Sequence, residues 1–386
     1  MLPRKLKPRI AALLAASPAV VLAGPRQCGK TTLARSLPRA VCFDMEAEQD
    51  RLRLDLEWPA LCAAKQLIVL DEAQCAPEVF PKLRAAIDDD RKRNGRFLLL
   101  GAVSPALMRT VSESLAGRAA LCELTPFFTG EMPQKDWDTL WRFGGFPDGG
   151  VLDTAQPSAQ FPRWQNDYLA MLAQRDFPLW GLPAKPPVTL RFLKILAALN
   201  AQPWNASQVG LSLGISYHTA AAYLAFLEQT YLLRVIQPWS GNTLKRLTKS
   251  PRVYWRDSGL CHALLGWTAE RDFFANPWVG ASWEGFVIEQ ILTAFKTAGI
   301  AAEPSWFRTS DGLEADLIVE FGAQRWVIEI KLTTAPSRSE LDVLEKVAGI
   351  VGATRSFLVT RTTKNAITEV KSSVNLAGML REIGKF

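Results

Sequence analysis

The run Gly24-Pro25-Arg26-Gln27-Cys28-Gly29-Lys30-Thr31 has the residue types and the spacing of a phosphate-binding loop. In a loop of the form G-x-x-x-x-G-K-[ST], backbone N–H groups surround the β-phosphate of a nucleotide, and the following helix directs its positive end at the same anion. Lys30 would reach the β- and γ-phosphates, and the Thr31 hydroxyl would hold Mg²⁺. We therefore expect an ATP-binding site formed by Gly24, Gly29, Lys30, Thr31 and Thr32.

A second motif further along the chain is compatible with this site. Four apolar residues precede two acids in the run Leu67-Ile68-Val69-Leu70-Asp71-Glu72. Asp71 would bind Mg²⁺ through water, and Glu72 would polarise the attacking water in ATP hydrolysis. The alternative is that both acids simply end a strand in solvent. The two motifs in this order favour an ATP site.

Hydrolysis also requires positive charge at the γ-phosphate. Arg118, which ends the run Ser114-Leu115-Ala116-Gly117-Arg118, is the candidate arginine finger or sensor, and a plain surface arginine is the alternative. A polar sensor would follow the third predicted strand, in Gly101-Ala102-Val103-Ser104. Ser104 is the only polar side chain in that run.

A predicted hairpin near the C-terminus carries a second set of chemically capable residues. Alternation places Asp316, Glu329 and Lys331 on one face, and it places the apolar side chains on the inward face. These apolar residues are Leu317, Val319, Trp326, Ile328 and Ile330. A turn near Gly322 would set Asp316 opposite Glu329, give or take one residue.

Two carboxylates and a lysine at one point can bind Mg²⁺ and activate water for phosphodiester cleavage. Glu284, on a predicted helix before the hairpin, could supply a third carboxylate. The alternative is a solvent-facing charged hairpin with ordinary ion pairs. We therefore predict a nuclease-like site formed by Glu284, Asp316, Glu329 and Lys331. The sequence leaves open whether this site cleaves a phosphodiester bond.

The nucleotide motifs require an α/β framework to position them. Residues 19–23 form a short all-apolar run, typical of a buried parallel strand, and 65–70 and 96–100 read the same way. Helical segments lie between these runs. The alternation predicts an α/β sheet with helices on both faces.

Residues 188–255 have the element order of a winged helix-turn-helix. A helix over 189–199 precedes one that Asn205 caps, Gly214 makes a turn, and Ser216 caps a third helix. Two strands, over 231–236 and 252–255, complete the pattern. Tyr217, His218 and Thr219 would lie near the start of the reading helix and could contact phosphates or base edges.

This segment is also the most basic part of the chain. Residues 188–265 contain eight Lys and Arg against two Asp and Glu. A basic wing would consist of Lys245, Arg246, Lys249 and Arg252. The pattern favours DNA as a partner of this segment. A protein-docking module or a rigid spacer is the alternative, because the fold serves both uses.

The whole chain has 386 residues, 48% of them apolar and 22% charged, which indicates a folded soluble protein of about two to four domains. Six cysteines without a C-x-x-C pair, and only two histidines, argue against a zinc site. We expect an ATPase domain over 1–135 and a helical connector or lid over 136–187. A winged helix over 188–265 and an α/β domain over 266–386 would follow.

The N-terminus resembles a signal peptide, because a basic stretch precedes apolar residues 10–23. Pro18 splits this stretch into a short helix and a strand that enters the phosphate-binding loop, and removal of that strand would displace the loop. No other run reaches the roughly 20 apolar residues of a membrane span. We expect a cytoplasmic protein with no membrane partner. A homo-oligomer or a protein partner is compatible with the sequence.

Together these residues resemble a large group of bacterial and archaeal AAA-like ATPases. The matching pieces are 24–32, 67–74, 112–118, Trp283-Glu284-Gly285-Phe286-Val287, and Glu314-Ala315-Asp316 with Glu329-Ile330-Lys331. The group joins its P-loop domain to a winged helix and a restriction-endonuclease-like C-terminal region of poorly defined function. The match is weakest over 130–185. One departure is Gly101-Ala102, where the group often has Gly-Ser.

The resemblance implies ATP-binding roles for Gly29, Lys30, Thr31 and Asp71, and an arginine role for Arg118. It implies endonuclease-like positions at Glu284, Asp316, Glu329 and Lys331. The resulting hypothesis is an ATP-hydrolysing protein that acts on DNA through its winged helix and nuclease-like domain. The rival is a regulatory or signalling ATPase that binds protein partners and uses both C-terminal modules as inactive scaffolds.

Overall fold

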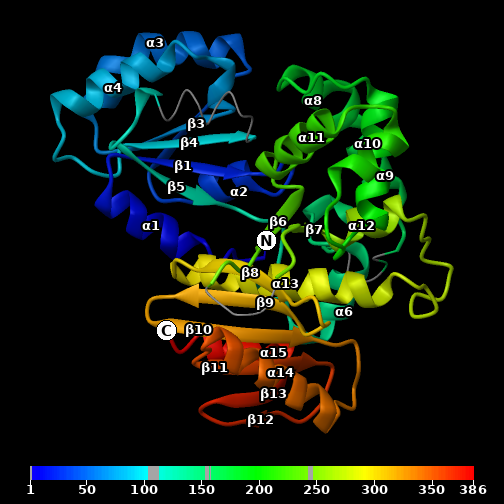
Figure 1. The fold of residues 1–386 in the computed structure, drawn as a ribbon. Helices are drawn as coiled ribbons and strands as arrows, with labels where there is room; N and C mark the ends of the chain where they lie inside the picture. The colour runs from blue at the N-terminus through cyan, green and yellow to red at the C-terminus, as the bar shows by residue number, and fades with distance from the viewer. Residues whose placement is uncertain (1, 103–112, 153–155, 157, 242–246) are drawn as a thin grey trace. The chain divides into compact units, whose positions relative to one another are not determined.

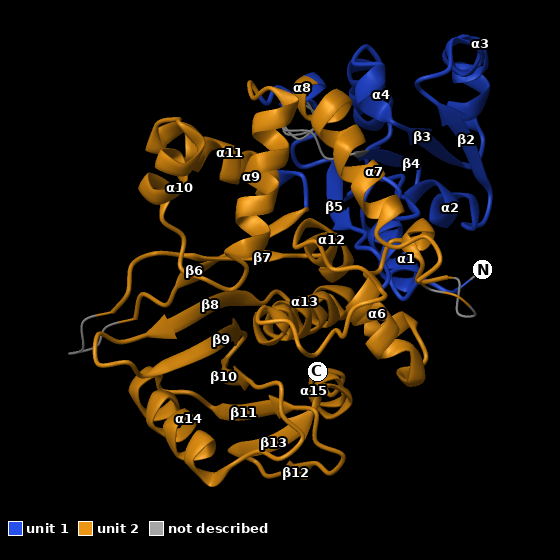
Figure 2. Cartoon of the chain, turned by 90° about the vertical axis from the view of Figure 1, so that its right-hand side faces the viewer, with its two compact units in different colours: residues 1–127, 179–182, 229–231 blue, residues 128–178, 183–228, 232–386 orange. Residues whose placement is uncertain are grey.

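The structure, a computed structural model, describes residues 2–102, 113–152, 156, 158–241 and 247–386. The chain forms two compact units, which are described separately (Figure 2). Unit 1 contains residues 1–127, 179–182 and 229–231. Unit 2 contains residues 128–178, 183–228 and 232–386.

Unit 1 is built on a five-stranded parallel sheet in the order β2-β3-β4-β1-β5 (Figure 1). Its strands are β1 (Ala19–Gly24), β2 (Ala40–Asp44), β3 (Leu67–Asp71), β4 (Phe97–Ala102) and β5 (Ala119–Glu123). Its helices include α1 (Lys7–Ala16), α2 (Lys30–Arg35), α3 (Glu48–Ala63) and α4 (Val79–Asp89). The predicted α/β sheet is therefore confirmed.

Helices cover both faces of this sheet. On one face, strand residues such as Val21 and Leu99 share a buried core with Leu54 of α3 and Leu83 of α4. Because neighbouring strand residues point to opposite faces, the buried Val20 belongs to the other face, where α1 and α2 contact β1. An all-apolar strand is expected where both faces are covered.

The three strands predicted from apolar runs are β1, β3 and β4. The edge strands β2 and β5 were not predicted, and each is only partly buried. The apolar N-terminal stretch folds as predicted, into α1 and β1. Strand β4 lies between β1 and β3, so the two nucleotide motifs extend from strands that are not neighbours.

Unit 2 contains an eight-stranded sheet in the order β12-β13-β11-β10-β9-β8-β6-β7. The strands are β6 (Leu233–Pro238), β7 (Arg252–Trp255), β8 (Glu303–Arg308), β9 (Glu314–Phe321), β10 (Gln324–Ile330), β11 (Arg355–Thr360), β12 (Ala366–Ile367) and β13 (Lys371–Asn375). Parallel pairs join β13 to β11, β11 to β10, and β8 to β6, and the remaining pairs are antiparallel.

The helices of unit 2 precede the sheet or cover it. They are α6 (Trp137–Phe143), α7 (Arg163–Met171), α8 (Phe177–Leu179, at the division between units), α9 (Pro186–Ala198), α10 (Ala206–Leu213), α11 (Tyr217–Gln229), α12 (Ser258–Leu264), α13 (Val279–Ala298), α14 (Arg338–Val351) and α15 (Leu376–Ile383). A π-helical turn, Leu172–Asp176, links α7 to α8.

Two helices lie on opposite faces of this sheet. Phe295 of α13 packs against Trp326 of β10, whereas Val327, the next residue, shares a core with Val347 of α14. Adjacent strand residues point to opposite faces, so the central strands are covered on both sides. The alternative of a solvent-facing charged hairpin does not hold at Asp316 for this reason: Asp316 and Ile318 are both buried.

Local signals in unit 2 were read correctly from the sequence. The Asn205 side chain accepts a hydrogen bond from Gln208 N at 3.1 Å, and Ser216 Oγ accepts one from Thr219 N at 3.1 Å. Gly214 and Gly299 end their helices in the left-handed conformation. Side-chain caps and glycine ends act within a few residues, so no tertiary contact is needed to predict them.

The predicted order of helices and strands over 188–255 is present, as α9, α10, α11, β6 and β7. The β6–β7 hairpin also continues the large sheet, because Gln237 and Pro238 of β6 pair with Ser305 and Trp306 of β8. Whether these elements act as a winged helix stays a prediction. Their hairpin shares one sheet with the strands that carry Asp316 and Glu329.

Candidate nucleotide-binding site and acidic cluster

The phosphate-binding loop connects β1 to α2. Gly29 adopts a left-handed conformation with φ of +97°, and α2 begins at the next residue. The buried Lys30 ammonium donates hydrogen bonds to the carbonyl oxygens of Gly24, at 3.0 Å, and Pro25, at 2.8 Å. The lysine is therefore folded over its own loop, at the start of a helix. Thr32 is exposed on the first turn of α2.

Gly24 lies where no side chain fits. A Cβ atom at this position would be 2.2 Å from the carbonyl oxygen of Leu124, which follows β5. The loop therefore leaves β1 in close contact with the neighbouring backbone, and glycine is required there for space.

The second motif reaches the loop through a side-chain hydrogen bond. Thr31 Oγ1 donates to Asp71 Oδ2 at 2.6 Å, although the residues are 40 positions apart. Burial raises the pKa of Asp71, and the Thr31 hydrogen bond acts in the opposite direction. The two residues predicted to hold Mg²⁺ are thus in direct contact, at the ends of β3 and the loop.

Glu72 follows in an uncommon backbone conformation for a non-glycine residue, with φ of +48°. Its backbone N–H donates to Asp71 Oδ1 at 3.1 Å, and Gln74 Nε2 donates to its carboxylate. Glu72 was assigned a role from its motif, whereas Gln74 was not. A glutamine two residues after an acid matches no sequence motif, so the orienting role of Gln74 could not be predicted.

Arg4 is a further residue that the sequence did not nominate. Its guanidinium donates to the carbonyl oxygens of Cys28, at 2.9 Å, and Thr125, at 2.5 Å, and lies 4.3 Å from the ring centroid of Phe127. It thereby ties the N-terminal segment to the loop and to the chain after β5. Nothing in the basic run around Arg4 distinguishes it from its neighbours.

Arg118 forms a two-point ion pair with Asp88 of α4. Its Nε and Nη2 atoms each lie 2.9 Å from a carboxylate oxygen of Asp88. The hydrogen bond from Arg118 lowers the pKa of Asp88 to about 2. In this structure the candidate finger is bound to its own domain. The second candidate, Ser104, lies outside the described residues.

The residues predicted to form an endonuclease-like site converge around an arginine of β7. Arg252 Nη1 lies 3.2 Å from Glu284 Oε1 and 3.3 Å from Asp316 Oδ1, and Nη2 donates to Glu314. The Tyr254 hydroxyl donates to Glu284 at 2.7 Å. We call Arg252, Glu284, Glu314, Asp316, Glu329 and Lys331 the acidic cluster. Arg252 and Glu314 were not assigned to such a cluster from the sequence.

The β9–β10 register agrees with the prediction. The last two pairs of the ladder are Val327↔Ile318 and Ile328↔Leu317, so Asp316 and Glu329 are the next residues along the two strands. Lys331 Nζ lies 2.5 Å from Glu329 Oε1. The Ile330 backbone N–H donates to Asp316 Oδ2 at 2.9 Å, which fixes the Asp316 carboxylate at the end of the hairpin.

The pairing of β8 with β9 is irregular beside Asp316. Ser305 pairs with Ile318 and Phe307 with Ala315, so that two β9 residues, Asp316 and Leu317, stand opposite Trp306 alone. Such a β-bulge turns a side chain out of regular alternation and is frequent beside functional sites.

The charges in the acidic cluster are strongly perturbed. Burial, with the nearby Asp316, raises the pKa of Glu329 to about 8, and burial likewise raises the pKa values of Glu284 and Asp316. Burial opposes the charged form of Lys331, but Glu329 and Asp316 nevertheless raise its pKa. Over the described part of the chain, no three His, Cys, Asp or Glu residues are grouped so as to hold a metal ion.

The predicted basic wing is corrected at Arg252. Its side chain is 6% exposed and pairs with the acidic cluster, so it does not present charge to a partner. The reason is tertiary: β7 joins the sheet that carries the carboxylates. Lys249 is exposed, and Lys245 and Arg246 lie outside the described residues. Tyr217 and His218 are exposed at the start of α11.

Two more arginines of this basic segment are also used internally. Arg234 Nε and Arg256 Nη2 each lie 2.7 Å from a carboxylate oxygen of the buried Glu289. Burial acts against ionisation of this carboxyl, yet the two guanidinium groups lower the pKa of Glu289. Part of the segment's positive charge is therefore balanced within unit 2.

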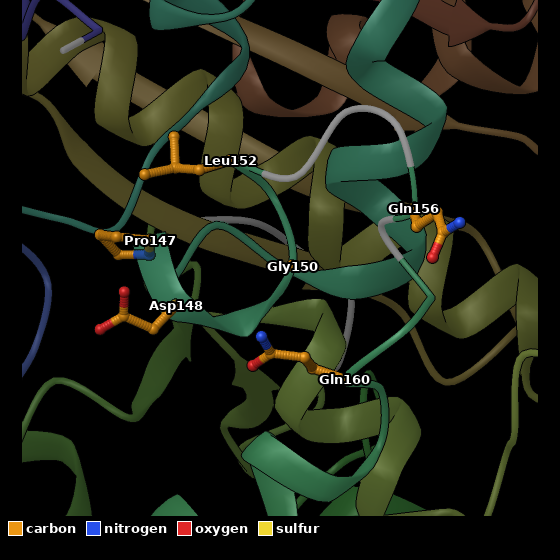
Figure 3. Close-up of a pocket in the computed structure, with 6 residues that line it drawn as sticks. All are labelled: Pro147, Asp148, Gly150, Leu152, Gln156 and Gln160. Atoms are coloured by element: carbon orange, nitrogen blue, oxygen red, sulfur yellow. The ribbon is translucent and has the colours of Figure 1, made fainter.

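Unit 2 also has a cavity of about 580 Å³ that the sequence did not predict. Figure 3 shows the residues that line it: Pro147, Asp148, Gly150, Leu152, Gln156 and Gln160. None of the six is a predicted site residue.

Three families match successive parts of the chain. An "AAA domain" family matches residues 16–132, and two domains of unknown function, DUF8612 and DUF4143, match residues 134–271 and 279–377. The uncharacterized protein Rv2008c of Mycobacterium tuberculosis is 37% identical over 335 residues, which cover 86% of this chain and 74% of that protein. The uncharacterized protein Mb2031c of Mycobacterium bovis matches to the same extent. The chain belongs to the same family of AAA-domain proteins as these two mycobacterial proteins.

Unit 1 of this AAA-domain protein is an AAA-like P-loop ATPase domain, a fold that points to ATP binding. A Walker-type ATPase of Pyrococcus abyssi is similar with a TM-score of 0.47 and 14% identity, over 69% of this chain and 96% of that chain. AMPPCP-bound DnaA from Aquifex aeolicus has a TM-score of 0.27 and 11% identity, over 58% and 86%. Across the described residues, no helix is long and apolar enough to span a membrane.

Proposed function

We propose that this AAA-domain protein binds ATP with Mg²⁺ in unit 1 and hydrolyses it. The observation that carries the proposal is the 2.6 Å hydrogen bond between Thr31 and Asp71, beside the buried Lys30 ammonium. Sequence motifs from two non-adjacent strands thus meet at one point. A hydroxyl and a carboxylate in contact suit Mg²⁺, which prefers oxygen ligands and retains several waters.

Each residue has a defined task in this proposal. Lys30 exchanges the carbonyl oxygens of Gly24 and Pro25 for phosphate oxygens, while the N–H groups of the loop and of α2 bind the same anion. Glu72, oriented by Gln74, holds the attacking water and accepts its proton. When bound, Mg²⁺ neutralises charge that develops on the phosphate oxygens.

A positive charge at the γ-phosphate is the remaining requirement. Arg118 lies beside Ala19, at the start of β1, whereas the loop follows the end of β1 at Gly24. In this proposal Arg118 therefore leaves Asp88 and acts in a second copy of the chain, as an arginine finger in trans. Its ion pair with Asp88 lies at the surface of the domain, where solvent screens the attraction, so release costs little.

The first test is Lys30→Ala, read by binding of a fluorescent ATP analogue and by phosphate release with Mg²⁺. We expect binding to weaken strongly and turnover to be lost, because the ammonium contacts both terminal phosphates. Lys82→Ala is the matched control, since Lys82 is an exposed lysine of the same unit that pairs with Asp55. Unchanged turnover in Lys30→Ala would refute the assignment.

We further propose that unit 2 acts on DNA, through residues 188–265 and the C-terminal domain. The contact of Glu329 with Lys331, next to the buried Asp316, supports phosphodiester chemistry at this point. The rival function is a regulatory ATPase that binds protein partners. It gains support from the internal pairing of Arg234, Arg252 and Arg256, which leaves less positive charge for DNA.

Labelled duplex, single-stranded and branched DNA separates these functions. Binding and cleavage would be measured with Mg²⁺ or Mn²⁺, with and without ATP, for wild type, Lys30→Ala and Lys331→Ala. Cleavage that Lys331→Ala abolishes and Lys30→Ala alters would support an ATP-gated nuclease. Salt-sensitive binding without cleavage would support a DNA-holding scaffold, and absence of both would support the protein-partner function.

A further inference from the structure

The acidic cluster contains its own cation. Arg252 contacts Glu284, Glu314 and Asp316 at once, and these carboxylates come from α13 and from β9. The fourth carboxylate, Glu329, pairs with Lys331. Each carboxylate of the cluster therefore faces a positive side chain.

Arg252 is held in place by its backbone and its ring contact. It pairs with Ile236 in the β6–β7 hairpin and forms a bridge with Pro203. Its guanidinium lies 4.3 Å from the ring centroid of Trp306, which stands opposite the β-bulge at Asp316. A cation over an indole face adds attraction where solvent is excluded. The hairpin thus fixes the charge among the carboxylates.

The cluster is short of partners in spite of these contacts. Glu329 Oε2 and Arg252 Nε are both buried and without a hydrogen-bond partner among the described residues. Buried groups of this kind are rare and costly, and they are expected where one arrangement excludes another. A carboxylate oxygen with free acceptor capacity beside Asp316 is a group that a hard cation would use.

We propose that Arg252 occupies the position of a divalent cation among Glu284, Glu314 and Asp316, and that it closes the acidic cluster to divalent metal ions. Arg252 and a metal ion are then alternative occupants of the same carboxylates. Metal enters only when the start of β7 withdraws from the sheet. This proposal concerns unit 2 and is independent of the ATP site in unit 1.

The physical basis is the cost of unpaired buried charge. If one partner of a buried ion pair is removed, the remaining charge destabilises the fold, because it has lost both water and its counter-ion. With Arg252 in place, a divalent ion would meet an extra positive charge. Without it, Glu284 and Asp316 would lose the guanidinium that both contact, and Glu314 would keep only Arg308. A divalent ion would restore the lost positive charge.

The test is a titration of nucleotide-free, full-length protein with Mn²⁺, followed by calorimetry and by thermal unfolding. We expect no Mn²⁺ site in unit 2 of the wild type. Arg252→Gln should unfold at a lower temperature than wild type, bind Mn²⁺ at least about tenfold more tightly, and regain stability with Mn²⁺. Asp316→Asn in the Arg252→Gln background should remove this binding. Arg252→Lys keeps the charge and should not gain the site.

Arg256→Gln is the matched control. Arg256 is equally buried, belongs to the segment that follows β7, and pairs with Glu289, which lies outside the acidic cluster. Its loss should lower stability without rescue by Mn²⁺. The proposal fails if Arg252→Gln gains no Mn²⁺ affinity, or if wild type already binds Mn²⁺ at a site that Asp316→Asn removes. The wild-type titration decides this even if Arg252→Gln does not fold.

Discussion

At the scale of single residues, the chemistry depends on side chains that secure one another. Thr31 and Asp71 are in contact, and Gln74 donates to Glu72. The Thr31 contact fixes which oxygen of Asp71 points toward the loop, and the Gln74 contact holds the Glu72 carboxylate. Arg118, by contrast, is secured away from this point by Asp88. Its role therefore depends on a change of partner.

Glu72 gives the sharpest prediction at this scale. Glu72→Gln keeps the shape of the side chain but removes the base, so turnover should fall by about 10²-fold or more, while ATP affinity stays near that of wild type. Phosphate release and analogue binding measure the two effects separately. Gln74→Ala should have a smaller effect on turnover, because it removes only the group that orients Glu72. A parallel loss of affinity in Glu72→Gln would indicate a binding role instead.

At the scale of elements, the helices of unit 2 are joined by buried polar groups. His262 of α12 is fully buried, with Nδ1 at 2.8 Å from the Arg142 carbonyl oxygen of α6 and Nε2 at 2.5 Å from Ser282 Oγ of α13. Trp141 Nε1 donates to the same Ser282 oxygen at 2.9 Å. If Nδ1 of a neutral His262 donates and Nε2 accepts, then the Arg142 carbonyl, the Ser282 hydroxyl and the Trp141 N–H all have hydrogen-bond partners.

This arrangement predicts a pH dependence of stability. Burial lowers the pKa of His262 to about 4, whereas an unfolded histidine has a pKa of about 6.5. Between these values the unfolded chain binds a proton that the native protein does not, so stability falls as pH falls. From pH 7 to pH 5 this histidine should remove about 2 kcal/mol of the free energy of unfolding.

Urea unfolding at pH 7 and pH 5 measures this effect. Tryptophan fluorescence reports mainly on unit 2, since Trp58 and Trp180 are the only two of the 13 tryptophans in unit 1. His262→Gln should show a smaller loss between the two pH values than wild type. The other histidine, His218, is exposed, so His218→Gln should retain the wild-type dependence. An identical loss in wild type and His262→Gln would contradict the argument.

At the scale of the whole molecule, net charge is a poor guide to the surface that a partner meets. The chain carries a net charge of +7, and residues 188–265 contain eight Lys and Arg. Three of these, Arg234, Arg252 and Arg256, are paired inside unit 2, so that 8 − 3 = 5 remain. Sequence composition counts buried and exposed charges alike.

The remaining charges set a limit on the salt dependence of DNA binding. If DNA binds through residues 188–265, the chain makes at most five phosphate contacts there. The logarithm of the binding constant should then fall with the logarithm of the salt concentration with a slope no steeper than about −4.5. Lys249→Gln should reduce the slope by about one unit, whereas Arg256→Gln should leave it unchanged. Binding titrations between low and physiological salt measure this. A steeper slope would place the DNA contacts elsewhere on the protein.

The sequence by itself determined the local features. The spacing of glycines with Lys30 and Thr31 specified the loop, continuous apolar runs specified β1, β3 and β4, and Asn205 and Gly214 specified the limits of α10. Such signals act through neighbouring residues or through complete burial, and both are visible in a single segment. The register of Asp316 with Glu329 also followed from a short turn.

Only the tertiary structure decided which charges are free. The pairing of β6 with β8 brings Arg252 from the expected DNA-binding wing into the acidic cluster, 64 residues from Asp316 in the chain. The helices on both faces of the sheet, with the β-bulge opposite Trp306, bury Asp316 to a depth that alternation alone does not predict. Electrostatic partners are selected by proximity in space, and spacing along the sequence carries no record of that choice.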